Sequence, residues 1–446
     1  LQDNTSFTLG APNHGDITVT LTSSNAAVLL SPNATTAGQS QITLPVANGV
    51  QTVGFYVQAL EGQTGSVTAT VTVSAPGFTN GTATATVVQA AFDLQGLPGT
   101  TTPLSPSNFV YARVGTAGAG NGSLNQVQNV RAGAPGPVTV TFTTPANGIG
   151  ELLKAGTAAG VTQTATIPVG VYYTPFDTTT GGVAFHPLAA LGTTTVSVAI
   201  PGLIATTQAT RSITNSTPNI SVGSLTVGSG LQDNTSFTLG ASNHGDITVT
   251  LTSSNAAVLL SPNATTAGQS QITLPVANGV QTVGFYVQGL EGLASAVSGT
   301  VTVSAPGFND GIATETIVPA ALDLQGVPAT MAVGAPDANI YVRVGTAAAG
   351  NGSLNQVQAV RAGLPAGSLS VSLTSSNLSA ATLVNGAGGT GSPQSVLILP
   401  GQSNSPTTVG AGGAAVRRVA AGSSSISAAS SGLTTTGQGT RSVTVQ

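Results

Sequence analysis

The side chains that could perform chemistry are few in this chain of 446 residues. It contains three histidines, thirteen carboxylates, nine basic residues and no cysteine. An active site needs several polar groups that converge, such as a nucleophile beside a base. His14 and His244 stand at the same position of a long repeat, and His186 is not reproduced in the other copy. We interpret all three as exposed loop or strand-edge residues, predict no catalytic residue, and expect a protein that is not an enzyme.

The ion that the remaining polar groups could bind is calcium, which takes clustered oxygen ligands. The chain has no EF-hand loop and no nonapeptide calcium repeat. Asp93 could instead pair with Arg113 or lie in a turn. The same alternative holds for Asp323 and Arg343. We therefore expect no cofactor, with calcium as the alternative at four aspartates: Asp3, Asp16, Asp93 and Asp323.

Ten asparagines are followed by the x-Ser/Thr pattern of glycosylation sites. In an exported chain, a glycan at these positions would cover surfaces that carry almost no charge. The alternative is that many of these patterns arise by chance in a chain rich in Ser, Thr and Asn. The sites are Asn4, Asn33, Asn80, Asn121, Asn215, Asn219, Asn234, Asn263, Asn351 and Asn377.

Nucleic acid and the membrane interior are not expected partners. The net charge is -4, and Arg417-Arg418 is the only basic pair, which gives no basic surface for phosphates. No apolar run approaches the roughly 20 residues of a membrane-spanning helix. The expected partner is a further copy of the chain itself.

The composition predicts an all-β protein. Charged residues make up 5% of the chain, against roughly 25% in ordinary globular proteins. With 40% hydrophobic residues the chain is too apolar for disorder. In Ile17–Thr22 apolar residues alternate with threonines, the pattern of a half-buried strand, and Gly54–Val57 and Val67–Val73 repeat it. About seven such strands fit each ~110 residues, which is typical of an antiparallel β-sandwich.

The chain is repetitive on two scales. Leu1–Gln58 recurs as Leu231–Gln288 with a single change, which gives a period of 230 residues. A related strand recurs within each period, with onsets at Ile17, Val138, Ile247 and Leu369. Tandem repeats of this kind predict an elongated array of four sandwich domains in the order A, B, A, B. The predicted boundaries are 1–90, 91–216, 217–320 and 321–446.

The segment 217–230, TPNISVGSLTVGSG, precedes the second copy and has no counterpart before Leu1. One interpretation is that the natural chain is longer and this sequence is a piece of it. The other is that another subunit supplies the strand, as in donor-strand assembly. In either case we expect Ile220–Val227 to form a first strand, without which Val19 and its neighbours would have an unpaired sheet edge.

The A-type motifs resemble those of a known family. A Thr-Val strand ends in Ser-Ser-Asn at Asn25, Gly-Phe-Tyr-Val-Gln follows, and then Val-Thr-Val-Ser-Ala-Pro-Gly-Phe ends at Phe78. This order resembles the bacterial immunoglobulin-like repeats of large surface and matrix proteins. The resemblance implies stalks, adhesins and matrix fibres outside the cell, and it assigns no chemistry to any residue.

Charge is distributed unevenly over the predicted domains. The net charges are -3 for 1–90, +1 for 91–216, -5 for 217–320 and +3 for 321–446. Opposite signs could bring the A domain of one chain beside the B domain of another; the alternative is that so few charges fall unevenly by chance. Strand edges without lysines also invite other chains. We predict a self-associating structural subunit of an extracellular filament, sheath or matrix fibre. The alternative is the stalk of a giant cell-surface adhesin.

Overall fold

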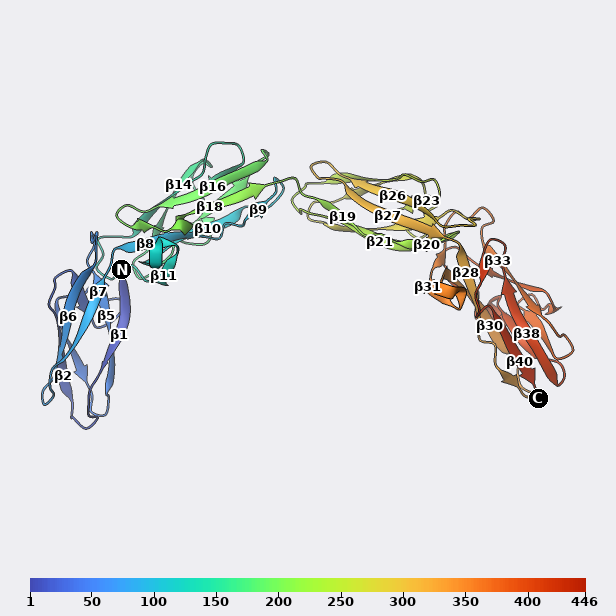
Figure 1. Cartoon of the computed structure of the whole chain (residues 1–446), viewed down its shortest axis with the longest axis horizontal. Coiled ribbons are helices and arrows are strands. Elements are labelled where there is room, and N and C mark those ends of the chain that lie inside the picture. The colour runs from blue at the N-terminus through green and yellow to red at the C-terminus, as the bar shows by residue number, and fades with distance from the viewer. The chain divides into compact units, whose positions relative to one another are not determined.

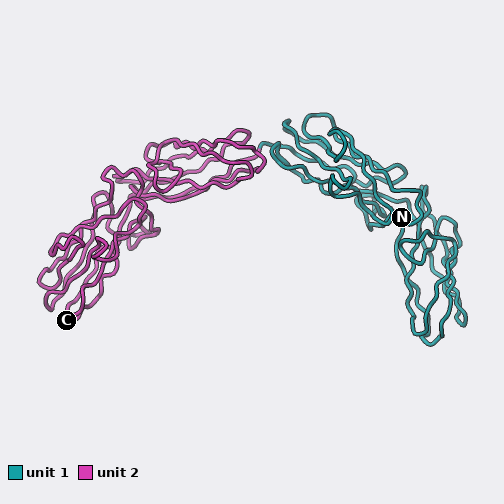
Figure 2. The backbone as a smooth tube through the Cα atoms, turned by 180° about the vertical axis from the view of Figure 1, so that it is seen from behind, with its two compact units in different colours: residues 1–217 teal, residues 218–446 magenta.

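The computed structural model describes residues 1–446 and consists almost entirely of β-strands. The predicted fold class, antiparallel β-sandwiches of the immunoglobulin-like type, is confirmed. The chain divides into two compact units, Leu1–Thr217 and Pro218–Gln446 (Figure 2). No helix in it is long and apolar enough to cross a membrane.

The first sandwich of unit 1 consists of two antiparallel sheets (Figure 1). The first sheet has, in spatial order, β1 (Gln2–Thr8), β5 (Thr52–Ala59) and β3 (Val28–Ser31). The second has β4 (Gln41–Val46), β2 (Ile17–Ser23), β6 (Val67–Ser74) and β7 (Gly81–Val87).

The alternation along β2 explains how this sandwich holds together. Val19 and Leu21 are fully buried, whereas Thr18 and Thr22 are exposed and Thr20 is half-buried. The two fully buried side chains pack with Leu30, Phe55 and Val71 into one cluster between the sheets. The two-residue alternation in the sequence therefore determines which side chains of β2 form the core.

The second sandwich of unit 1 has more strands than the seven expected. One sheet runs β13 (Gly150–Leu153), β15 (Val183–Pro187), β10 (Asn108–Ala117), β8 (Ala90–Gln95) and β17 (Ile204–Ala205), and β11 (Leu124–Val127) also pairs with β10. The other runs β14 (Thr162–Ile167), β12 (Val138–Thr143), β16 (Gly192–Ala199), β18 (Thr210–Asn215) and β9 (Thr100–Thr101). The 3-10 turns are η1 (Ala119–Asn121), η2 (Thr178–Thr180) and η3 (Thr207–Ala209).

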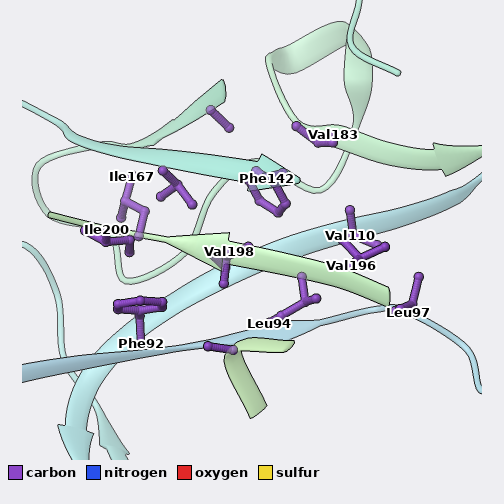
Figure 3. Close-up of a cluster of buried hydrophobic side chains, with 14 of the residues drawn as sticks. Phe92, Leu94, Leu97, Val110, Phe142, Ile167, Val183, Val196, Val198 and Ile200 are labelled. Carbon is purple, nitrogen blue, oxygen red and sulfur yellow. The ribbon is translucent and has the colours of Figure 1, made fainter. Parts of the chain in front are cut away.

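Figure 3 shows the core of this second sandwich. Five side chains from four strands point into the space between the two sheets, and each is at most 3% exposed: Phe92, Leu94, Phe142, Ile167 and Val196. Burial of large side chains of this kind stabilises a fold by about 1.5–3 kcal/mol each.

The first sandwich of unit 2 contains two strands that its counterpart in unit 1 does not have, β19 and β20. One sheet runs β19 (Ile220–Val222), β21 (Leu231–Leu239), β25 (Thr282–Gly289) and β23 (Val258–Ser261), and β32 (Ala359–Val360) pairs with β21. The other runs β20 (Thr226–Gly228), β27 (Gly311–Val318), β26 (Val297–Ser304), β22 (Ile247–Ser253) and β24 (Gln271–Val276).

The second sandwich of unit 2 repeats the second sandwich of unit 1. One sheet runs β35 (Thr390–Gly391), β34 (Ala381–Asn385), β37 (Ala414–Arg418), β30 (Ala338–Ala347), β28 (Ala320–Gln325) and β39 (Thr434–Thr435), with β31 (Leu354–Val357) on β30. The other runs β29 (Thr330–Met331), β40 (Thr440–Val445), β38 (Gly422–Ala429), β33 (Leu369–Ser375) and β36 (Gln394–Ile398). The turns are η4 (Ala349–Asn351) and η5 (Val409–Ala411).

The expectation about an unpaired edge at Val19 is wrong. Val19 lies in β2, which is hydrogen-bonded to β4 on one side and to β6 on the other. The segment expected to form one strand forms two short ones, and these join different sheets: β19 pairs with β21, and β20 pairs with β27. The edges concerned in unit 1 are therefore β1 and β7.

Candidate functional site

The few charges of the chain are used mostly in pairs rather than gathered into a site. Five arginines form ion pairs with carboxylates, at nitrogen–oxygen distances of 2.5–2.7 Å. No three His, Asp or Glu side chains come close enough together to hold a metal ion. The arrangement that stands out is instead the joint between the two sandwiches of each unit.

An ion pair closes the joint of unit 1. Arg131 of the second sandwich donates from Nε to Glu61 Oε1 at 2.7 Å and from Nη2 to Glu61 Oε2 at 2.6 Å. The side chain of Arg131 is only 7% exposed, and it also donates to the carbonyl of Ala132. A bidentate pair of a buried guanidinium and a carboxylate fixes the relative orientation of the two side chains as well as the distance between them.

Glu61 is held in its ionised form by this contact. Burial alone would raise the pKa of Glu61, but the hydrogen bonds and the positive charge of Arg131 together outweigh it. The pKa of Glu61 therefore lies below its ordinary value of 4.5. The joint stays charged at neutral pH.

A glutamine network completes the joint beside the ion pair. Gln2 is 3% exposed, and its Oε1 accepts from the Ala132 backbone at 3.0 Å and from Gln58 Nε2 at 2.9 Å. The Gln2 backbone nitrogen donates to the carbonyl of Asn129 at 2.9 Å. Buried amides that satisfy one another in this way hold one arrangement of the two sandwiches.

Unit 2 contains the same joint at the equivalent positions. Arg361 donates to Glu291 from both Nε and Nη2, at 3.0 and 2.5 Å. Gln232 accepts from the Ala362 backbone at 3.1 Å and from Gln288 at 2.9 Å. The joint is thus a property of the repeat and not of one copy.

The calcium candidates all have protein partners. Asp93 is 1% exposed and is held by Arg113 at 3.0 and 2.6 Å, directly across the β8–β10 pair. Its counterpart in unit 2, Asp323, pairs with Arg343 in the same way. The ion-pair alternative for these two aspartates therefore describes their contacts.

The other two calcium candidates, Asp3 and Asp16, are not among the carboxylates paired with arginine. Asp3 Oδ2 accepts from the side chains of Gln126 and Gln128, at 2.5 and 3.2 Å, and so belongs to the joint. Asp16 accepts from the Asn48 backbone at 2.9 Å and lies in an exposed loop. The four aspartates do not converge on one place.

The histidines are placed differently from the expectation of exposed positions. His14 and His244 lie in loops, but each ring packs edge-on against a phenylalanine, Phe78 or Phe308, at centroid distances of 6.0 and 6.1 Å. His14 is half-buried and His244 is 9% exposed. His186 lies in β15, which has a neighbour on either side, and its ring contacts Ser107 Oγ at 3.1 Å.

The asparagines of the predicted glycosylation sites are mostly accessible. Eight of the ten are exposed, and Asn351 is half-buried. Asn215 is 1% exposed, and its amide nitrogen donates to the carbonyls of Leu188 and Ala190 at 2.7 and 2.8 Å. A glycan at Asn215 would leave its amide nitrogen a single hydrogen and so remove at least one of these bonds, whereas glycosylation at the exposed asparagines remains a prediction.

Two features were not found from the sequence. One is an aromatic group in unit 1, in which Phe176 packs on Tyr111 and Tyr173 at centroid distances of 4.5 and 4.6 Å. The closeness of Tyr173 and Phe176 in the sequence was its only signal. The other is a cleft of about 910 Å³ between β1 and β7, lined among others by Phe7, Val73 and Gln128.

No family model matches this chain, and no curated protein is similar to it in sequence. Similar solved structures include a tetra-tandem repeat from the extending region of a large adhesion protein, 12% identical, with a TM-score of 0.16, covering 99% of this chain and 95% of that one. Domains 4 and 5 of the S-layer protein SbsC are 17% identical, with a TM-score of 0.23 over 51% and 97%. CBD12 from CALX1.2 is 10% identical, with a TM-score of 0.25 over 49% of this chain and 80% of that one.

Proposed function

We propose that this chain is a non-enzymatic structural protein of the cell exterior, a self-associating subunit of a filament, sheath or matrix fibre. Its four domains, with the boundaries predicted above, belong in this proposal to the bacterial immunoglobulin-like repeats of surface proteins. Each pair of domains acts as one stiff building block. The proposal includes neither a cofactor nor a substrate.

The observation that carries the proposal is the joint found in both units. Domains on flexible linkers move relative to one another by default, and a small polar contact does not prevent this. Here a buried arginine, a buried glutamine pair and a backbone hydrogen bond act together at each joint. The chain has few charges, and two of its five ion pairs lie at these joints. This favours a fixed orientation of the two sandwiches within each unit.

The joint also bears on how copies associate. The acidic first sandwich and the more basic second sandwich meet within a unit through Glu61 and Arg131. Several of the charges that were expected to attract a neighbouring chain are therefore already paired. This favours association through uncharged strand edges over association through charge.

The second candidate is a stalk segment of a giant adhesin. The same stiff joints favour it, because a spacer also needs fixed geometry between its domains and needs no self-association. The two candidates differ in what the chain does alone in solution.

Electron microscopy of the purified chain, with sedimentation at several protein concentrations and two salt concentrations, tests the proposal. Regular filaments whose formation is indifferent to salt would support a structural subunit that assembles through strand edges. Assembly that is lost at high salt would instead support association through the alternating net charges of the domains. A monomer under all conditions would contradict self-association and leave the stalk.

A further inference from the structure

The aromatic group of unit 1 lies on the outward face of the sheet that contains β8 and β10. Phe109 and Tyr111 are two residues apart on β10, so both side chains point away from the core. Tyr173 pairs with Arg113 of β10 across an isolated bridge and faces the same side. Phe176 packs against Tyr111 and Tyr173 at centroid distances of 4.5 and 4.6 Å. We call these four rings the aromatic strip: Phe109, Tyr111, Tyr173 and Phe176.

The rings of the strip are accessible, and unit 2 does not repeat them. Phe109 and Phe176 are 49% and 47% exposed, and Tyr111 and Tyr173 are half-buried. Unit 2 keeps Tyr341 at the place of Tyr111. At the other three places it has polar residues: Asn339 for Phe109, Asn404 for Tyr173 and Thr407 for Phe176. Grouped aromatic surface in one copy and polar residues in the other indicate a site of interaction rather than a requirement of the fold.

The backbone around the strip is the same in both units. The nitrogen of Ala112 donates to Thr174 Oγ1 at 3.1 Å in unit 1, and the nitrogen of Val342 donates to Ser405 Oγ at 3.0 Å in unit 2. Unit 2 therefore shows that this backbone forms without the rings. Because residues can be exchanged between the two copies on one backbone, unit 2 serves as a control for unit 1.

Polar groups of β8 and β10 lie beside the rings. Arg113 donates to the buried Asp93 from Nε and Nη2, at 3.0 and 2.6 Å, and Gln95 donates to Asp93 Oδ2 at 2.8 Å. Gln95 is directly opposite Tyr111. Nη1 of Arg113 and the hydroxyls of Tyr111 and Tyr173 are not buried and make no hydrogen bond within the chain. These groups are available to a ligand that lies on the rings.

The charges and the ring geometry disfavour several classes of ligand. The charges of Arg113 and Asp93 cancel, and Asp177 next to Phe176 is exposed, so the surroundings do not attract an anion such as phosphate. Tyr173 and Phe176 stack on each other with an angle of 23° between the rings, which leaves no gap in which they could enclose a cation. A stable protein interface takes roughly 20–30 residues a side, many more than this strip has. What remains is an uncharged ligand with apolar faces and polar edges.

A carbohydrate has this chemistry. The C–H groups on the face of a sugar ring are attracted to the negative face of an aromatic ring, and its hydroxyls donate and accept hydrogen bonds at the edge. The N–H groups of Arg113 and the hydroxyls of Tyr111 and Tyr173 are suitable partners for these hydroxyls. Compact ligands are usually bound in concave pockets, whereas the strip lies along the outer face of a sheet, which suits an extended polymer.

We propose that the aromatic strip binds an uncharged polysaccharide, whose sugar rings stack on Phe109 and Phe176 and whose hydroxyls bond to Arg113 and the two tyrosines. The site belongs to unit 1 alone, because unit 2 has three polar residues in its place. It goes beyond the proposed function, and it would attach either a matrix subunit or a stalk to polysaccharide outside the cell.

Saturation-transfer NMR of the full chain tests the site with four uncharged probes: cellohexaose, laminarihexaose, mannohexaose and N-acetylchitohexaose. We expect at least one of them to receive saturation, mainly at its C–H protons, with a Kd in the millimolar range and one site per chain. The chain has no tryptophan and six tyrosines, two of them in the strip, so tyrosine emission should also change on binding. No signal from any probe at about 5 mM, where a millimolar Kd would be seen, overturns the proposal.

Exchanges toward unit 2 locate the site. Tyr173→Asn with Phe176→Thr gives unit 1 the residues that unit 2 has, so the fold should be retained and the affinity should fall by about tenfold or more. Phe109→Asn alone should weaken binding less. Leu191 is an apolar residue of the same sandwich outside the strip and is 55% exposed, so Leu191→Ala should bind as the natural chain does. Equal binding by all of these chains would place the ligand elsewhere and overturn the proposal.

The reverse exchange builds a second strip in unit 2. Asn339→Phe, Asn404→Tyr and Thr407→Phe should together raise the stoichiometry in equilibrium dialysis from one oligosaccharide per chain to two. A stoichiometry that stays at one would show that the rings do not make the site, and it would contradict the proposal. A double variant of unit 1 that self-associates differently, when no oligosaccharide binds the natural chain, would make the strip a contact between copies and overturn the proposal as well.

Discussion

The first sandwiches of the two units share a nearly identical stretch, Leu1–Gln58 and Leu231–Gln288, but differ in burial. Phe7 is half-buried, whereas Phe237 is fully buried. The difference comes from a 14-residue segment outside the repeated stretch, which closes one sandwich and leaves the other open along one side. Identical sequences can therefore form the same strands and still differ in core, because a core is completed by whichever strands cover it.

Among the differences between β7 and β27, one changes a buried charge beneath the segment. Unit 1 has Ala85, and unit 2 has Glu315 at the equivalent place. Glu315 is fully buried, its Oε2 accepts from the nitrogen of Leu225 at 2.6 Å, and its Oε1 has no partner. Burial raises the pKa of Glu315 to about 7, and the bond from Leu225 opposes this only in part. Burying the charged form of Glu315 therefore costs free energy of folding in the first sandwich of unit 2, and the first sandwich of unit 1 has no such cost.

The largest expected effect comes from removing the anchors of the segment. Ile220→Ala together with Val227→Ala should destabilise the first sandwich of unit 2 by about 4 kcal/mol, because two well-buried side chains leave cavities. Hydrogen exchange should then be as fast in β21 and β27 as it is in β1 and β7. Unchanged protection of β27 would show that the segment does not decide the difference between the sandwiches.

A smaller effect is expected at the joint. Glu61→Ala leaves the buried Arg131 without its carboxylate, which should cost about 2 kcal/mol in unit 1. The intact pair of Arg361 and Glu291 serves as an internal control in unit 2. Denaturant unfolding monitored by hydrogen exchange in each unit measures the cost. Equal loss in both units would contradict a local role for the pair.

The stability of unit 2 should depend on pH through Glu315, whereas unit 1 has no such group at the equivalent position. Because the folded pKa of Glu315 is raised, its protonated form favours folding below pH 4.5, and this advantage is lost as the pH rises toward about 7. Glu315→Ala, which copies unit 1, should remove this dependence and stabilise unit 2 at pH 8 by about 1–2 kcal/mol. Melting curves from pH 4 to pH 8 test this, with Thr314→Ala, at an exposed neighbour, as the control. A natural chain equally stable at pH 4.5 and pH 8 would contradict it.

The smallest expected effect is that of metal removal. The candidate aspartates are held by arginines, glutamines or backbone groups, so EDTA should shift the melting temperature of either unit by less than about 1 °C. Added calcium should be equally without effect. A calcium-dependent rise in melting temperature, lost in Asp16→Asn, would identify a site in that exposed loop.

Much of the fold could be predicted because local patterns determine it. The alternation in β2 places Val19 and Leu21 inside, and the repeat period transfers this assignment to Ile247–Ser253. The pairing of Asp93 with Arg113 could be predicted as the alternative to a calcium site, because two adjacent strands bring the opposite charges into register.

The joint and the cleft could not be predicted in the same way. Gln2 and Ala132 are joined across 130 positions, and no local pattern signals such a contact. The segment 217–230 was expected to form one strand, but its central Gly223-Ser224 lets the chain cross from one sheet to the other. Periodicity shows which face of a strand is buried, but it does not show which sheet the strand joins.

The parallel pairs at the sheet edges bear on how these sandwiches resist a pulling force. β20 with β27, β9 with β18 and β29 with β40 each join a strand near the start of a sandwich to its last strand. Tension applied at the two ends of such a sandwich pulls the paired strands past each other, so their hydrogen bonds carry the load together rather than one after another. In the first sandwich of unit 1, the last strand, β7, pairs only with β6, so this sandwich has no such parallel pair and should be the first of the four to open under tension.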